Sequence, residues 1–138
     1  MTYEEILQRA TINRRRSPRD EEHRLQCSCV SWFNSQYPKL KGLLYAVPNG
    51  GRRDKVTASK LKQEGVVAGV SDLNLDLRTD RYGGLRIEMK TPTGRQSESQ
   101  KQWQKKVTEI GGYKYVVCRS LDDFICIIIN YLEDVRLD

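Results

Sequence analysis

Two short segments of the sequence place acidic and basic side chains where they could do chemistry together. Residues 71–77 (SDLNLDL) and residues 85–90 (LRIEMK) alternate apolar and polar positions, a pattern typical of strands with one buried face. Side chains in a strand alternate between its two faces, so the polar residues of each segment share one face. If the two strands pair antiparallel, Asp72 approaches Glu88 and Lys90.

A pair of carboxylates at this position would favour a bound cation. Two carboxylates held close together repel each other, so either one takes a proton or a cation lies between them. Hard divalent ions such as Mg²⁺ prefer oxygen ligands, and they neutralise phosphodiesters and lower the pKa of a bound water. Lys90 could orient the attacking water or stabilise charge on the phosphate. From the strand pattern alone, however, a solvated face with cross-strand ion pairs is the more common explanation.

The elements that must position these residues can be predicted from capping signals and apolar periodicity. Helices are expected over residues 18–36, 55–64, 97–110 and 121–134, and strands over residues 43–47, 71–77, 85–90 and 113–118. The order is helix, strand, helix, strand, strand, helix, strand, helix. It predicts an α/β fold in which helices pack on a mixed sheet.

The domain organisation follows from length and charge. Residues 18–138 are long enough for one domain and contain no linker. Residues 1–17 are expected to form a basic N-terminal arm, because no acidic residue lies between Ile6 and Arg19. Such an arm is either solvated or in contact with phosphate, and the sequence favours neither alternative.

The composition favours a polyanionic partner. The 138 residues include 24 Lys and Arg against 18 Asp and Glu, for a net charge of +6. The sequence has neither an apolar leader nor an apolar run that could span a bilayer, so a cytoplasmic protein without a membrane partner is expected. The only histidine, His23, counts against a histidine-based general base.

Several short motifs, taken as a set, are similar to those of a known family. The segments EEHRLQ, PNGG, GVSD, IEMK and SESQKQW occur in this order and resemble the VRR-NUC family, a branch of the PD-(D/E)XK nuclease superfamily. The resemblance covers residues 21–132. It implies a PD-(D/E)XK nuclease-like mixed β-sheet flanked by helices. It also implies an endonuclease that hydrolyses DNA phosphodiester bonds with Mg²⁺, for which Mn²⁺ substitutes, and that needs no small-molecule cofactor.

The resemblance also implies a particular set of site residues. Asp72 and Glu88 match the family's metal ligands, together with the backbone carbonyl of Met89 and a glutamate of the first long helix. For that glutamate EEHRLQ offers Glu21 and Glu22, of which Glu22 is preferred because it precedes Gln26 by four positions.

Two further residues match the family's remaining catalytic positions. Lys90 matches its lysine, and Gln100 matches its glutamine on the helix that follows the second core strand. Gln100 has an equally good structural explanation, because Ser97 followed by Gln100 is a capping box. One residue departs from the family pattern: Ser71 stands where the family usually has proline.

Stand-alone members of the family resemble Holliday-junction resolvases, which act as dimers on branched DNA. Flap, nick or duplex cleavage is the nearest alternative, and a non-catalytic DNA-binding module with the same fold is another. Basic residues that could contact the DNA backbone are Arg52, Arg53, Lys55, Arg95 and Lys101, although surface lysines and arginines are common on any protein.

The last predicted helix is the only sequence feature that points to a homodimer. Its core face is predicted to hold Leu121, Phe124, Ile125, Ile128 and Leu132. Its other faces then also carry apolar residues, namely Cys126, Ile127, Ile129 and Tyr131. A helix that is apolar nearly all round is buried in its own fold or at a subunit contact, and two-fold dimers are the commonest oligomers.

Overall fold

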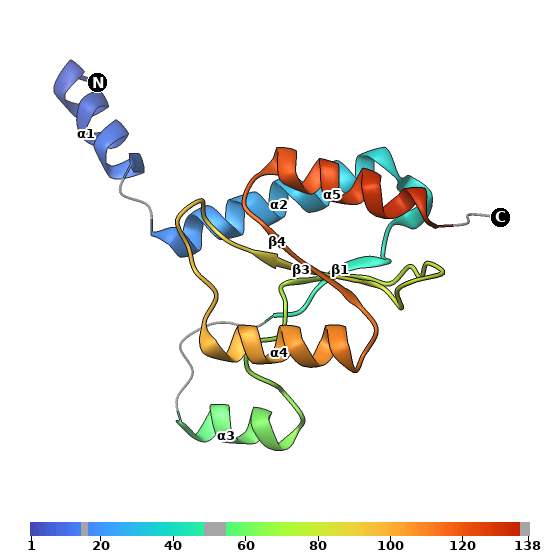
Figure 1. The fold of residues 1–138 in the computed structure, drawn as a ribbon. Coiled ribbons are helices and arrows are strands. Elements are labelled where there is room, and N and C mark those ends of the chain that lie inside the picture. The colour runs from blue at the N-terminus through green and yellow to red at the C-terminus, as the bar shows by residue number, and fades with distance from the viewer. Residues whose placement is uncertain (15–16, 49–54, 136–138) are drawn as a thin grey trace.

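The fold is a four-stranded mixed sheet with helices on both faces (Figure 1). The computed structural model describes residues 1–14, 17–48 and 55–135. The sheet order is β1 (Leu44–Ala46), β2 (Leu73–Leu75), β3 (Leu85–Met89), β4 (Lys114–Cys118). The first two pairings are antiparallel, and β3 pairs with β4 in parallel. The expected α/β architecture is therefore confirmed.

Five helices and one 3₁₀ turn complete the described chain. They are α1 (Tyr3–Arg14), α2 (Pro18–Gln36), the turn η1 (Pro38–Leu40), α3 (Lys55–Gln63), α4 (Glu98–Glu109) and α5 (Leu121–Glu133). The bounds of α2 match the expected helix, because Ser17 caps it and Pro18 occupies its first position. None of these helices, within the described ranges, is long and apolar enough to cross a membrane.

The apolar core lies between the sheet and the helices α2 and α5. Cys29 and Phe33 of α2 and Phe124 and Ile128 of α5 are fully buried against the apolar face of the strands. That face carries Leu73, Leu75, Leu85, Ile87 and Met89, as the alternation predicts. Figure 1 shows α2 and α5 side by side above the sheet and α4 below it.

The polar face of the sheet is buried around Glu88, whereas at its other end the alternative of a solvated, ion-paired face holds, because Arg86 forms an ion pair with the exposed Asp76 at 3.2 Å. Glu88 is only 3% exposed. Helix α4 covers this face, with Trp103 packed edge-on against Tyr115 of β4. Gly69 allows the loop before β2 to approach α4 closely, because a Cβ there would lie 2.4 Å from the backbone of Ser99. Its φ of 85° also favours glycine.

The strands of the site are shorter than expected, although their hydrogen bonding extends further. β2 spans three residues instead of seven. Beyond its two ends, the N–H of Val47 donates to the carbonyl of Asp72 and the N–H of Asp76 donates to the carbonyl of Leu43, both at 2.9 Å. The Asp72 carbonyl is therefore tied to the chain of β1 just before the start of β2.

The expected N-terminal arm contains the helix α1. Thr2 and Glu5 form a reciprocal cap: the Thr2 hydroxyl accepts the Glu5 N–H, and the Glu5 carboxylate accepts the Thr2 N–H. This cap is a sequence signal, and the charge pattern of the segment conceals it. In Figure 1, α1 extends away from the sheet.

The faces of α5 differ from the expected pattern at Ile127 and Tyr131, and Ile127, expected outside the core face, is partly buried and packs against the core. Tyr131, expected outside the core face, is 2% exposed and donates a hydrogen bond to the carbonyl of Leu77. Cys126 and Ile129 are exposed, as expected for residues outside the core face. The apolar surface that α5 leaves uncovered is therefore smaller than the sequence suggested.

We predict that Phe124→Ala lowers the free energy of unfolding by about 3–5 kcal/mol, because it empties a fully buried site that also contacts Trp32. Urea titration monitored by circular dichroism measures the loss. The matched control on the same helix is Asn130→Ala, which should change stability by less than about 0.5 kcal/mol because Asn130 is exposed. Equal losses from the two variants would contradict the assigned faces of α5.

Candidate active site

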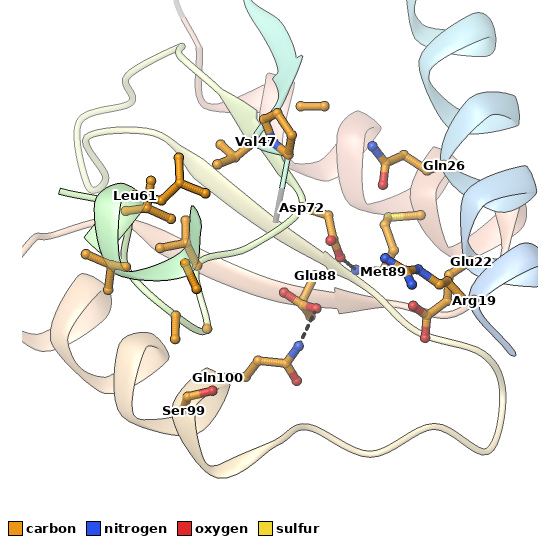
Figure 2. Close-up of a pocket in the computed structure, with 18 of the residues that line it drawn as sticks. Arg19, Glu22, Gln26, Val47, Leu61, Asp72, Glu88, Met89, Ser99 and Gln100 are labelled. Atoms are coloured by element: carbon orange, nitrogen blue, oxygen red, sulfur yellow. Dashed lines mark hydrogen bonds between the residues drawn. The ribbon is translucent and has the colours of Figure 1, made fainter. Parts of the chain in front are cut away.

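The strand register brings Asp72 and Glu88 together. Leu73 pairs with Ile87 across β2 and β3, which places the preceding Asp72 beside Glu88. One Asp72 carboxylate oxygen, Oδ2, accepts the backbone N–H of Met89 at 2.8 Å. Figure 2 shows the two carboxyl groups close together at the edge of the cavity. The approach of the two acids expected from the alternation is therefore present.

Glu88 is the most strongly perturbed acid of this pair. Its Oε1 accepts a hydrogen bond from Gln100 Nε2 at 2.9 Å and lies 4.0 Å from the Lys90 ammonium. Its Oε2 is buried and has no hydrogen-bond partner. Burial, followed by the nearby charge of Asp72, raises the pKa of Glu88 to about 9. The site therefore holds a buried carboxyl that is costly to ionise without a cation nearby.

Gln100 both caps α4 and contacts Glu88. Its Oε1 accepts the N–H of Ser97 at 2.8 Å and completes the capping box of α4. Its Nε2 donates to Glu88. Because the same side chain closes the helix end and holds Glu88, the start of α4 is fixed relative to β3.

Glu22 reaches the site from α2, on the other side of the carboxylate pair (Figure 2). Its carboxylate lies near the backbone N–H of Thr91 and near Lys90 and Asp72. Burial raises the pKa of Glu22 above its ordinary value. The other candidate, Glu21, is exposed and does not line the cavity. Of the two glutamates, the structure places Glu22 at the site.

The acids open onto a cavity of about 1160 Å³ with two different walls. One wall is formed by α2, where Arg19, Glu22 and Gln26 follow one another along a single helix face. The opposite wall is apolar and comes from α3 and the loop that follows it, including Leu61, Val66 and Val67. Neither Arg19 nor this apolar wall was predicted from the sequence. The spacing of three residues between Arg19 and Glu22 could have indicated that Arg19 shares the helix face of Glu22.

The expected DNA contacts lie outside this cavity or outside the described chain. Arg52 and Arg53 fall in residues 49–54, which the structure does not describe. Lys55 begins α3, and Arg95 and Lys101 flank the start of α4; all three are exposed and none lines the cavity. Met89 lines the cavity beside Asp72, and the role of its carbonyl stays a prediction.

The donor set fits a divalent cation, although it is not a closed metal site. Within the described ranges, no three His, Cys, Asp or Glu side chains are arranged to hold an ion by themselves. The open carboxylate pair, the unpaired Oε2 of Glu88 and the nearby Glu22 nevertheless supply the oxygen donors that Mg²⁺ prefers. An ion held by one or two carboxylates completes its shell with water and substrate phosphate.

Comparison with known proteins identifies the family. The chain matches the model of the VRR-NUC domain over residues 4–122. A solved structure titled "VRR_NUC domain protein" superposes with a TM-score of 0.72 at 29% identity, covering 85% of this chain and 92% of that chain. No curated protein matches the chain. The protein belongs to the VRR-NUC family, so it carries a nuclease-type domain for which DNA is the implied substrate.

We predict that Glu88→Gln stabilises the metal-free protein at neutral and higher pH. The raised pKa of Glu88, about 9 against 4.5 for an ordinary glutamate, means that the folded state holds this proton more tightly than the unfolded state. The contribution of Glu88 to folding is therefore complete below about pH 4.5 and is lost as the pH rises towards 9. A glutamine stays neutral throughout and can donate to Asp72.

Urea titrations in EDTA between pH 5 and about pH 9 measure this effect. The free energy of unfolding should fall with pH less steeply in Glu88→Gln than in the parent. The control is Glu109→Gln, an exposed acid at the end of α4, which should retain the parent slope. A parent-like slope in Glu88→Gln would show that Glu88 does not hold its proton in the fold.

Proposed function

We propose that the protein is a metal-dependent DNA endonuclease that hydrolyses phosphodiester bonds with Mg²⁺, for which Mn²⁺ can substitute. The observation that supports this proposal is the adjacent Asp72–Glu88 pair, which lines a large cavity and in which Glu88 Oε2 is buried without a hydrogen-bond partner. A structural salt bridge would pair such oxygens with protein donors. Open oxygen donors beside a cavity suit a hydrated divalent ion instead.

Each acid has a role in this proposal. Asp72 and Glu88, with the Met89 carbonyl, would hold the ion directly, and Glu22 would complete the ligand set through one of the waters on the ion, because the three acids are not arranged to hold it by themselves. The ion would bind the phosphate, stabilise the charge of the transition state and lower the pKa of a coordinated water. The Met89 N–H fixes the Asp72 carboxylate, and Gln100 fixes Glu88. These bonds restrict both acids to one orientation before substrate arrives.

Lys90 places a positively charged side chain beside the acids. Its side chain is only 11% exposed, and its ammonium lies 4.0 Å from Glu88 Oε1. A partly buried ammonium beside the carboxylates can donate to a nonbridging phosphate oxygen or orient the attacking water. In the absence of substrate its positive charge also lowers the pKa of Glu88 and of Glu22, opposing the effect of burial.

The preferred substrate in this proposal is branched DNA such as a four-way junction, cut by a homodimer. The net charge of +6 favours backbone contacts, and Arg95 and Lys101 lie at the end of α4 that carries Gln100. Backbone contacts position a protein without reading sequence, which suits selection by DNA shape. The exposed Ile129 and Cys126 of α5 are the residues we assign to the dimer contact.

We predict that Asp72→Asn reduces cleavage by more than about 100-fold, the upper figure for loss of an outer-shell partner of a metal, while DNA binding is unchanged or tighter. The asparagine oxygen can still accept the Met89 N–H, so the fold is retained while one negative charge is removed. Cleavage of labelled DNA and fluorescence anisotropy measure the two effects. Asp76→Asn on the same strand edge is the control, because Asp76 is exposed and does not line the cavity.

Parent-like cleavage by Asp72→Asn would rule out this site. Cleavage by neither protein, with tight DNA binding by both, would instead favour the alternative of a non-catalytic DNA-binding module.

We predict that the purified protein nicks a labelled four-way junction with Mg²⁺ or Mn²⁺ and is inactive in EDTA. Two symmetric nicks are expected, because a dimer presents two sites to a two-fold junction. Flap, nicked and linear duplexes of the same sequence are the matched substrates. Metal-dependent cleavage confined to flaps or duplex would retain the chemistry and reject the junction, and a monomer by sedimentation equilibrium would reject the dimer.

A further inference from the structure

A tight turn joins the end of β3 to the loop that leads to α4. In the segment Thr91–Gly94, the N–H of Gly94 donates to the carbonyl of Thr91 at 3.2 Å, and Pro92 occupies the second position, as is common in β-turns. The turn directly follows Lys90. A Cβ added to Gly94 would lie 3.0 Å from Thr91 Oγ1 and 3.5 Å from Lys90 Cδ, so the turn packs against the stem of the lysine.

Arg119 binds this turn from the neighbouring strand. It directly follows β4, and its Nη1 donates to the carbonyls of Thr91 at 2.8 Å and Gly94 at 2.7 Å, with the carbonyl of Pro92 at 3.4 Å. Within the described ranges, no carboxylate forms a salt bridge with its guanidinium. Arg119 is half-buried and donates its side-chain hydrogen bonds to the backbone carbonyls of this one turn. Such charged donors restrict the position of the turn.

This turn contacts the active site at two points, through Thr91 and through the preceding Lys90. The N–H of Thr91, which is 7% exposed, lies close to the Glu22 carboxylate of α2. The preceding Lys90 is held by a hydrogen bond from its N–H to the carbonyl of Cys118, the residue before Arg119. The peptide groups that flank Thr91 therefore link Arg119 on one side to Glu22 on the other.

We propose that Arg119 is a positioning residue of the nuclease site: by binding the carbonyls of Thr91–Gly94 it orients the Thr91 N–H toward Glu22 and confines Lys90. This role rests on the proposed function. Without the guanidinium, two carbonyls lose a charged donor, the turn loosens and the Thr91 N–H is no longer held close to Glu22. Arg119 lies outside the residues that line the cavity, so it acts through Thr91 instead of touching substrate.

The test combines steady-state kinetics with hydrogen exchange. Arg119→Met should lower kcat by about 10- to 100-fold, the usual effect of an outer-shell partner, with little change in KM for DNA. Arg119→Lys should recover most of kcat, because an ammonium also offers three donors. In metal-free protein, the amides of Thr91 and Gly94 should exchange faster in Arg119→Met. Arg78→Met, an exposed arginine in the β2–β3 loop, is the matched control and should behave as the parent.

A double-mutant cycle separates positioning from a general structural effect. If Arg119 acts through Glu22, the variant Glu22→Gln/Arg119→Met should lose little more kcat than Glu22→Gln alone. Additive losses, a raised KM with unchanged kcat, or unchanged exchange at Thr91 would each overturn the proposal. If Arg119→Met fails to fold, Gly94→Ala perturbs the same turn with Arg119 intact, and parent-like kcat in that variant would also count against it.

The experiment distinguishes failure of this proposal from failure of the proposed function. A parent protein that cleaves no DNA refutes the nuclease activity, and hydrogen exchange at Thr91 still decides whether Arg119 holds the turn. A parent that cleaves, together with an Arg119→Met variant that cleaves equally well, refutes only the positioning role.

Discussion

The close approach of the Asp72 and Glu88 carboxyl groups is the constraint on which the rest of the site depends, because burial and the charge of Asp72 make Glu88 costly to ionise. Two acids side by side on a sheet face would relax in water by turning apart. Here one Asp72 oxygen is held by the Met89 N–H, and Glu88 is covered by α4 and held by Gln100. The fold therefore maintains the unfavourable contact between Asp72 and Glu88. This contact lowers the free energy of unfolding at the position where a buried acid is useful.

The rest of the fold supplies the rigidity that this contact requires. The apolar face of the same strands carries Leu73, Ile87 and Met89, all within the core formed with α2 and α5. Since neighbouring side chains of a strand point to opposite faces, fixing the apolar residues in the core also fixes the direction of the acids between them. Core and site are two faces of one sheet, and a slip of the register would destroy both.

Sequence patterns predicted this arrangement where the signals are local. Alternation along residues 71–77 and 85–90 is sufficient to bring Asp72 and Glu88 together, and the Ser97 cap locates the start of α4. Sequence patterns failed to predict the burial of residues that are covered by a distant segment of the chain. Nothing local indicates that α4 buries Glu88 or that Tyr131 turns into the core to reach the carbonyl of Leu77. Those positions are set by tertiary contacts between distant segments.

The charges of the protein act in opposite directions at long and short range. A net charge of +6 attracts a polyanion over about one Debye length, roughly 8 Å at physiological ionic strength. At the site itself, Asp72, Glu22 and Glu88 lie around Lys90, and burial raises the pKa of both glutamates, so ionising these acids beside a phosphate is costly without a further cation. In the proposed function a divalent ion reverses the local sign. DNA can then bind through the basic surface without the ion, whereas the scissile phosphate can settle against the acids only when the ion is present. In this proposal capture is separated from cleavage because the acids line the cavity, whereas Lys55, Arg95 and Lys101 lie outside it.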